Sequence, residues 1–304
     1  MPAPWMPDWA ALMARALPIN VPAGAGYLYL IADSHLGDRR APPGEFVAML
    51  RGLEQPRAVV FLGDLFTVWL APPKYREPVA QEVLAGFQSL RDRGARTVFV
   101  VGNREFFLPR SPAETRRWGL PFDAIVPGAA VLTWAGRRYG LTHGDLASVH
   151  DVQYLKWRWL SRSWPFEAAF RAMPAGFARR IARKLERSLA TTNREIKIQY
   201  PQEDLRAFAQ AVLPGLDGFF IGHFHRDEVI AVPPTAPPSL TLPPEQPGGR
   251  EPTGRDRAFT SPSPAVGGGD RGGATLRIVP DWHARKVVLR VDDRGGVEYV
   301  RGIA

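Results

Sequence analysis

Five short apolar runs, each followed directly by side chains that can bind a metal ion, constrain this 304-residue chain most strongly. Short apolar runs bounded by glycine are typical of buried strands. The runs are Tyr27–Ala32, Val59–Leu62, Val98–Val101, Tyr139–Thr142 and Phe219–Ile221. Helical stretches at residues 44–53 and 78–93 separate the first three. This alternation predicts an α/β layered architecture.

The side chains after these runs form one candidate ligand set. Its members are Asp33, His35, Asp64, Asn103, His143, His223 and His225. Residues just past the carboxyl ends of strands in an α/β sheet face a shared crevice, so we expect all seven to converge. Four of the six histidines of the chain occupy these positions, which argues against chance placement. Seven ligands are too many for one ion and suit two.

The composition narrows the chemistry of this set. The chain has no cysteine, which excludes disulfides, thiolate nucleophiles and iron–sulfur clusters and fits a reducing compartment. With only nitrogen and oxygen ligands, Mn²⁺, Fe²⁺, Zn²⁺ and Mg²⁺ are the candidates, and an imidazole-rich set favours the first three. No apolar run is long enough for a transmembrane helix.

Two divalent ions about 3.5–4 Å apart form the usual clamp for hydrolysis of phosphoesters. Water held between such ions becomes a hydroxide near neutral pH and can attack phosphorus. Asp64 lies in the middle of the ligand order, so it is the expected bridging carboxylate. The sequence shows no phosphate-binding P-loop and no serine or cysteine nucleophile motif, which agrees with water as the nucleophile.

Together these motifs resemble the calcineurin-like metallophosphoesterase superfamily. They are Asp33-x-His35, Gly63-Asp64, Gly102-Asn103-Arg104-Glu105, His143-Gly144-Asp145 and Gly222-His223-x-His225. The resemblance implies an α/β fold, an α/β/β/α sandwich of two mixed sheets. It also implies that Asp33, His35, Asp64 and His225 hold one metal ion, and that Asp64, Asn103, His143 and His223 hold the other. Two Mn²⁺ ions are the expected cofactors.

Arg104 stands where most members of the superfamily have histidine. Arginine is always protonated, so it cannot act as a titrating acid, but it can grip phosphate oxygens. Gly-Asn-Arg is similar to the UDP-2,3-diacylglucosamine diphosphatases of lipid A synthesis, as are Asp151-x-x-Tyr154-x-x-x-Arg158 and Asp281-Trp282. That resemblance implies release of UMP and 2,3-diacylglucosamine 1-phosphate, with Arg104 and Asp64 as catalytic residues.

The same resemblance predicts the substrate contacts. They are Asn103, Arg104, Asp151, Tyr154, Arg158, Arg187 and Asn193. The match is loose around the last two residues, and Ser34 replaces the leucine that is usual in the first motif. The expected substrate is therefore a lipid-linked nucleotide.

Residues 150–198 carry eleven basic and only four acidic side chains, together with several tryptophans and phenylalanines. We expect this segment to form a helical lid inserted between the fourth and fifth motifs. Its charge and aromatic content suit an anionic membrane surface, where each basic residue contributes roughly 1 kcal/mol. The expected location is the cytoplasmic side of the inner membrane, held peripherally. The alternative is a helical pair with a solvated arginine face.

The remaining segments carry weaker signals. Residues 1–26 form an extension in which Trp5, Trp9, Leu12, Met13, Ala16 and Leu17 make one helical apolar stripe, with Asp8 as a candidate N-cap. This helix either docks on the protein or lies at a membrane interface. Residues 231–274 are rich in proline and glycine and predict a disordered loop within the domain of residues 27–304. Strands at 275–279, 286–291 and 297–300 should then close a second sheet.

Two other functions are compatible with parts of the sequence. Another metallophosphodiesterase or a nuclease on the same fold would suit the positive charge, yet no nucleic-acid motif is present, so no stable nucleic-acid partner is expected. A membrane-associated scaffold without catalysis would be expected to have lost ligands, and all seven are present.

Overall fold

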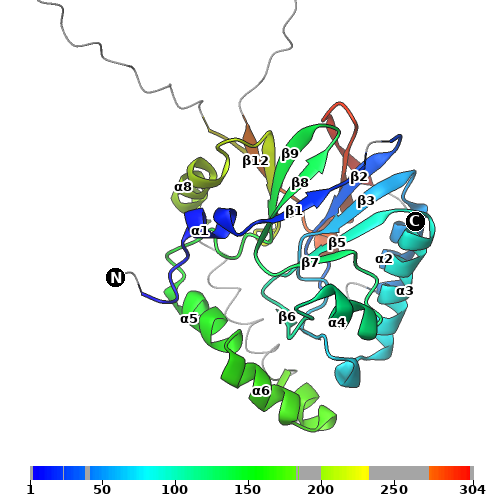
Figure 1. Ribbon diagram of the computed structural model, residues 1–304, viewed down its shortest axis with the longest axis vertical. Helices are drawn as coiled ribbons and strands as arrows, with labels where there is room; N and C mark the ends of the chain where they lie inside the picture. Colours follow the sequence, from blue (N-terminus) through cyan, green and yellow to red (C-terminus); the bar gives the residue numbers. More distant parts are fainter. Residues whose placement is uncertain are drawn as a thin grey trace, which may run out of the picture.

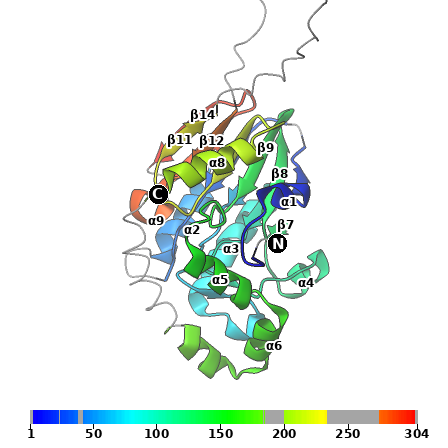
Figure 2. The ribbon, with the colours of Figure 1, turned by 90° about the vertical axis from the view of Figure 1, so that its left-hand side faces the viewer.

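The computed structural model describes residues 3–22, 24–37, 42–182, 184, 200–232 and 274–301. Two six-stranded mixed sheets pack face to face, and helices cover their outer faces (Figures 1 and 2). The predicted α/β/β/α sandwich is therefore confirmed.

The first sheet has the order β1 (Leu17–Asn20), β8 (Ala129–Trp134), β9 (Arg137–Thr142), β10 (Gly218–Ile221), β12 (Thr275–Ile278), β11 (Glu228–Ala231). The second has the order β14 (Val297–Arg301), β13 (Val287–Val291), β2 (Tyr27–Ile31), β3 (Pro56–Phe61), β5 (Arg96–Val100), β7 (Ala124–Val126). A small sheet joins β4 (Trp69–Leu70) to β6 (Glu105–Phe106). Short helices at Pro73–Tyr75 (η1) and Pro112–Arg117 (α4) lie in the connections.

The second sheet is buried on both faces, which explains its continuous apolar runs. In β2, Tyr29 and Ile31 join the core beneath α2 (Pro43–Gly52) and α3 (Pro78–Asp92). Leu28 and Leu30 point the other way, into the core between the two sheets. Because β2, β3, β5 and β7 run parallel, their carboxyl ends emerge at the same end of the sandwich.

The N-terminal segment is part of the sandwich. Helix α1 (Trp9–Ala14) is capped by Asp8, whose side chain accepts a hydrogen bond from the Ala11 amide at 2.9 Å. The Trp9 ring packs edge-on against Phe208 of α8 (Gln202–Val212), with centroids 5.5 Å apart. Helix α1 thus packs on the body of the protein. Strand β1 pairs with β8, so part of the segment before residue 27 lies in the first sheet.

Within the segment expected to form a lid, the structure describes α5 (Val152–Ser161), α6 (Trp164–Ala172) and further helical residues at 175–182. It runs along the lower edge of the molecule in Figure 1. It packs on Leu70, Tyr75 and Phe107 through Phe170 and Ala178. Arg187, Asn193 and most of the proline- and glycine-rich segment (233–273) lie outside the described residues.

The C-terminal strands correct another expectation. They do not close one sheet together, because β12 pairs with β10 and β11 in the first sheet. Strands β13 and β14 form the expected hairpin, but β13 pairs with β2 in the second sheet. The chain crosses between the sheets through the short helix α9 (Trp282–Arg285), which begins next to the end of β2.

Candidate metal centre

All seven candidate ligands meet at one end of the sandwich. The second sheet supplies Asp33 and His35 after β2, Asp64 after β3 and Asn103 after β5, and the first sheet supplies His143 after β9 and His223 and His225 after β10. Strands β9 and β10 run parallel, as β2, β3 and β5 do, so the loops of both sheets face each other. The strand-end argument thus predicted the convergence.

Five of the seven residues have a left-handed backbone conformation, which residues other than glycine rarely adopt. The φ angles are 51° for Asp33, 43° for His35, 58° for Asp64, 69° for His223 and 52° for His225. Such conformations cost of order 1–3 kcal/mol each and cluster at functional sites, where the surroundings hold them. The orientation of these side chains therefore costs the folded protein some stability.

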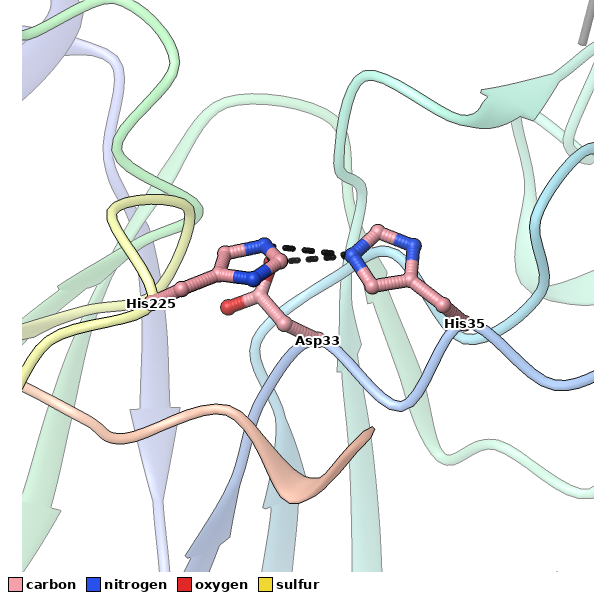
Figure 3. Close-up of side chains that lie close together, drawn as sticks. All are labelled: Asp33, His35 and His225. Atoms are coloured by element: carbon pink, nitrogen blue, oxygen red, sulfur yellow. Dashed lines mark hydrogen bonds and ion pairs between the residues drawn. The ribbon is translucent and has the colours of Figure 1, made fainter. Parts of the chain in front are cut away.

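Site A consists of Asp33, His35 and His225. The Nε2 atoms of the two histidines lie 3.2 Å apart and point toward each other beside Asp33 (Figure 3). The Asp33 Oδ1 atom lies 3.5 Å from His225 Nε2 and 4.0 Å from His35 Nε2. These three atoms thus surround one point.

Site B consists of Asn103, His143 and His223. The Asn103 Oδ1 atom lies 2.9 Å from His143 Nε2 and 3.2 Å from His223 Nδ1, and these two nitrogens are also 3.2 Å apart. His143 Nδ1 donates to the Leu62 carbonyl oxygen at 2.6 Å, which directs the Nε2 lone pair into the site.

Asp64 lies between the two sites and is 2% exposed. Its Oδ1 atom is 3.5 Å from His143 Nε2 in site B, and its Oδ2 atom is 4.0 Å from His35 Nε2 in site A. One carboxylate thus offers an oxygen to each site, as a bridging ligand must. Ligand atoms of Asp33, Asp64 and His143 also lie within 4.8 Å of one another, so the two sites adjoin.

The donor sets fit divalent ions. Two ligand atoms each about 2.1 Å from one ion are about 3.0–3.4 Å apart at bond angles of 90–109°. The spacings of 2.9–3.2 Å in site B and the 3.2 Å between the two histidine nitrogens of site A are close to this range, whereas Asp33 Oδ1 lies farther from those nitrogens, at 3.5 and 4.0 Å. Two imidazole lone pairs facing each other at 3.2 Å repel unless a positive charge lies between them. Asp33 Oδ1 is buried without a hydrogen-bond partner, which a bound cation would satisfy.

The electrostatics favour positive charge at the same place. Burial alone would lower the pKa of His143, but the carboxylates of Asp64 and Asp33 outweigh it and raise this pKa to about 9. Burial lowers the pKa of His223 to about 3, so this ring is neutral and keeps a lone pair for a ligand bond. Without metal, a proton on His143 balances the carboxylates. A divalent ion would replace it.

Glycine is required where the ligand loops touch. A Cβ atom on Gly102 would lie 2.4 Å from Asp64 Oδ1 and 2.6 Å from the Asp64 amide nitrogen. A Cβ atom on Gly222 would lie 2.7 Å from Asp33 Oδ2. Both distances are shorter than side chains tolerate, so these glycines permit the close approach of the two sheets.

Arg104 lies against the shared carboxylate. Its amide donates to Asp64 Oδ1 at 2.9 Å, and its Nε is 3.7 Å from Asp64 Oδ2. The side chain is nearly buried, and Nε has no hydrogen-bond partner among the described residues. The guanidinium group is thus a fixed positive charge at the border of sites A and B.

Glu105 has a structural role that its place in the Gly-Asn-Arg-Glu motif did not reveal. Its carboxylate accepts hydrogen bonds from the amides of Gly102, Leu65 and Asp64 at 2.7, 2.9 and 3.1 Å. Burial raises the pKa of Glu105 to about 7. Glu105 therefore ties the loop after β5 to the loop after β3 and fixes the spacing of Asn103 and Asp64.

The expected substrate contacts on α5 also bond to protein groups. Asp151 caps the helix by accepting from the Tyr154 amide at 3.0 Å. The Tyr154 hydroxyl donates to Asp145 Oδ2, and Arg158 Nε donates to the same oxygen at 2.7 Å. Asp145 was not predicted as a site residue, although the His143-Gly144-Asp145 motif contains it.

The fold and this site define a class of protein. Residues 27–227 match the model of the calcineurin-like phosphoesterase family, which is well over half of the chain. The chain therefore belongs to this family and is a metal-dependent hydrolase of phosphorus esters or anhydrides.

Two similar proteins share one name. The chain is 30% identical over 183 residues to a UDP-2,3-diacylglucosamine hydrolase of Ralstonia nicotianae, covering 59% of this chain and 65% of that protein. It is 28% identical over 279 residues to a protein of the same name from Stenotrophomonas maltophilia strain R551-3, covering 87% of this chain and 94% of that protein. A solved structure of a Thermotoga maritima protein overlaps at 13% identity with a TM-score of 0.38, covering 91% of this chain and 98% of the other. That overlap is too low to support an inference.

Proposed function

We propose that this protein is a two-metal hydrolase that cleaves the pyrophosphate of UDP-2,3-diacylglucosamine. One water is consumed: its oxygen adds to the phosphorus on the uridine side, and the bond from this phosphorus to the bridging oxygen breaks. The products are UMP and 2,3-diacylglucosamine 1-phosphate. The names of the two relatives support this substrate class.

The observation that carries the proposal is the position of Arg104 beside the carboxylate shared by sites A and B. A permanently charged planar guanidinium suits a substrate with two adjacent phosphoryl groups, because it can grip oxygens of both. In the proposed reaction Arg104 offsets the charge that develops as the pyrophosphate bond breaks. Asn103 and Arg104 are the proposed contacts to the phosphates.

The proposed cofactors are two Mn²⁺ ions. Site A with Asp64 offers two imidazole nitrogens and two carboxylates, and site B with Asp64 offers two imidazole nitrogens, one amide oxygen and one carboxylate. Such mixed nitrogen and oxygen sets suit Mn²⁺, Fe²⁺ and Zn²⁺ better than Mg²⁺. When bound, the two ions supply Lewis acidity and a water acidified to near neutral pKa.

The lid supports a lipid substrate. A cavity of about 300 Å³ lies between α5 and the residues after Asn103, with apolar walls from Phe106, Phe107 and Leu108. Acyl chains need such a surface beside a cationic site. Asp151 at the start of α5, with Arg187 and Asn193, completes the proposed substrate contacts.

The outer face of the lid supports a membrane partner. Trp164, Phe177 and Trp159 are 72%, 56% and 52% exposed. Glu167 is the sole acid in residues 152–182, and it is buried in ion pairs with Arg110 and Arg171. Residues 152–182 thus expose aromatic and basic side chains but no carboxylate, which suits an anionic lipid surface. We propose peripheral binding to the cytoplasmic face of the inner membrane. In the described part of the chain, no helix is long and apolar enough to span a bilayer.

The decisive experiment is incubation of the purified protein with Mn²⁺ and three substrates in parallel. These are UDP-2,3-diacylglucosamine in detergent micelles, a simple aryl phosphodiester and single-stranded DNA. We expect UMP from the first at a rate far above turnover of the others. Degradation of DNA without release of UMP would establish the nuclease alternative and end the lipid proposal.

The Arg104→Lys variant sharpens this experiment, because lysine keeps the charge but loses the planar, two-pronged geometry. We expect it to lose most activity on UDP-2,3-diacylglucosamine and to keep a larger share of any activity on the aryl phosphodiester, which has one phosphate. Equal losses on both substrates would contradict a pyrophosphate-specific role for Arg104.

A further inference from the structure

Helix α5 presents one face to the metal centre and the opposite face to solvent. Tyr154 and Arg158 of α5 and Arg162, which caps the C-terminal end of the helix, are spaced four residues apart, so they lie in one stripe. All three side chains reach the loops that carry the candidate ligands. Lys156 and Trp159 lie on the exposed side.

The stripe contacts the surroundings of site B at three points. Tyr154 and Arg158 both donate to Asp145 Oδ2, and Asp145 follows His143 by two residues. Arg162 Nη2 donates at 2.5 Å to the carbonyl oxygen of Gly102, which immediately precedes Asn103. The Tyr154 ring also lies 6.4 Å from the ring of His223, measured between centroids. The stripe therefore bonds to chain neighbours of His143 and Asn103, and its Tyr154 ring lies near His223.

These contacts use one donor of each side chain, namely the Tyr154 hydroxyl, Arg158 Nε and Arg162 Nη2, on protein acceptors. The Tyr154 hydroxyl and Arg158 Nε share one carboxylate oxygen of Asp145, which is 4% exposed. A buried ion pair is costly to break once formed, because either partner would be left as an unpaired charge. The pair therefore holds α5 and the loop after β9 in one relative position.

We propose that Tyr154, Arg158 and Arg162 are positioning residues that hold the ligands of site B. Because binding linkage is reciprocal, an ion in site B then favours the docked lid, and the docked lid tightens the ion in site B. Site A has no such link to α5 among the described residues. This inference rests on the part of the proposed function that assigns two ions to sites A and B.

The test is a Mn²⁺ titration of the full chain, with free Mn²⁺ followed by electron paramagnetic resonance. Tyr154→Phe and Arg158→Lys are the test variants, since each keeps size while removing or displacing one bond to Asp145. Residues that orient metal ligands typically change affinity by about 10-fold to 100-fold. We expect one of the two sites to weaken by about tenfold or more and the other to stay within twofold. Lys156→Met, on the outer face of the same helix beside Trp5, is the matched control and should change neither site.

Two background variants identify the affected site. His35→Ala removes a ligand of site A and leaves site B to be measured, whereas His223→Ala does the reverse. Tyr154→Phe should weaken Mn²⁺ binding in the His35→Ala protein and have no effect in the His223→Ala protein. An equal effect in both backgrounds would overturn the assignment to site B.

A direct substrate contact would give a different result. In that case Tyr154→Phe and Arg158→Lys would raise KM while both Mn²⁺ affinities stayed unchanged, and the positioning role would be refuted. The titration needs no substrate, so it also separates the two proposals. A shifted titration with no release of UMP from the wild-type protein would end the proposed substrate and leave the positioning role standing.

Discussion

Sites A and B share Asp64 but are supported by different parts of the molecule. In site A, His225 Nδ1 lies 3.9 Å from Asp281 Oδ2, and the His35 ring packs edge-on against His283 at 6.0 Å. Both supporting residues belong to the crossing segment at α9, whose Asp281 forms a bridge with Ala32 at the end of β2. Site B is supported by α5, which belongs to the inserted lid.

This difference in support shows how an inserted helix can affect one metal site of a rigid fold. The support of site A is part of the sandwich, with Asp281 only 2% exposed and held by its bond to the Ala284 amide. The support of site B comes from a helix whose other face is exposed to solvent. Movement of the lid would therefore disturb one half of the centre and spare the other.

The largest expected effect comes from the residue that both sites share. Asp64→Ala removes a ligand from sites A and B together, so Mn²⁺ binding at both sites should fall. Hydrolysis should drop roughly a thousandfold or more, which corresponds to about 4 kcal/mol of activation free energy. Metal content and UMP release measure the two effects, and circular dichroism should show an intact fold. Turnover at the wild-type rate would refute the site.

Gly102→Ala should damage both sites through the same carboxylate. The new Cβ would lie 2.4 Å from Asp64 Oδ1, so Asp64 or the loop after β5 must move. Such overpacking typically costs about 1–3 kcal/mol, and we expect lower thermal stability with weaker Mn²⁺ binding at both sites. Gly176→Ala is the control, because a Cβ there has no atom within 4 Å. Damage restricted to one site would break the view that Asp64 couples the two.

The metal ligands and the residues that support them differ in how well they could be predicted from the sequence. The strand ends placed Asp33, Asp64 and His143 correctly, because apolar runs and the parallel arrangement are local and repetitive signals. The motifs included Glu105 and Asp281 but did not reveal that these residues support the ligands. Glu105 and Asp281 act through contacts between segments far apart in sequence, which spacing along the chain does not encode.

Helix α5 is a second place where the sequence alone did not predict the contacts. Tyr154 and Arg158 were singled out in the sequence as residues four apart in one motif, but their partner Asp145 was not. The contact with Asp145 comes only from the fold, and the role of Tyr154 and Arg158 toward a substrate stays a prediction. The same reasoning explains β1, whose pairing with β8 joins residues more than a hundred positions apart.

Asp281→Asn should have the opposite site preference to the α5 variants in Mn²⁺ binding. Loss of the negative charge near His225 Nδ1 should weaken site A and leave site B within twofold, because no described contact joins Asp281 to Asn103, His143 or His223. The separation of 3.9 Å places the expected loss near the lower end of the usual range, about tenfold. The same Mn²⁺ titration measures it. A weaker site B in this variant would show that the two halves are not supported independently.

The smallest effect is expected far from both sites, at the ion pair between Arg91 of α3 and Asp123. Their atoms are 2.7 Å apart, but the side chains are 37% and 28% exposed, so solvent screens the attraction. Arg91→Gln should lower the free energy of unfolding by less than about 1 kcal/mol and change neither Mn²⁺ affinity. Urea denaturation and the Mn²⁺ titration measure these two quantities on one preparation. If this distant change weakened site B alone, general loosening of the protein would suffice to weaken that site, and the specific role of α5 would lose its support.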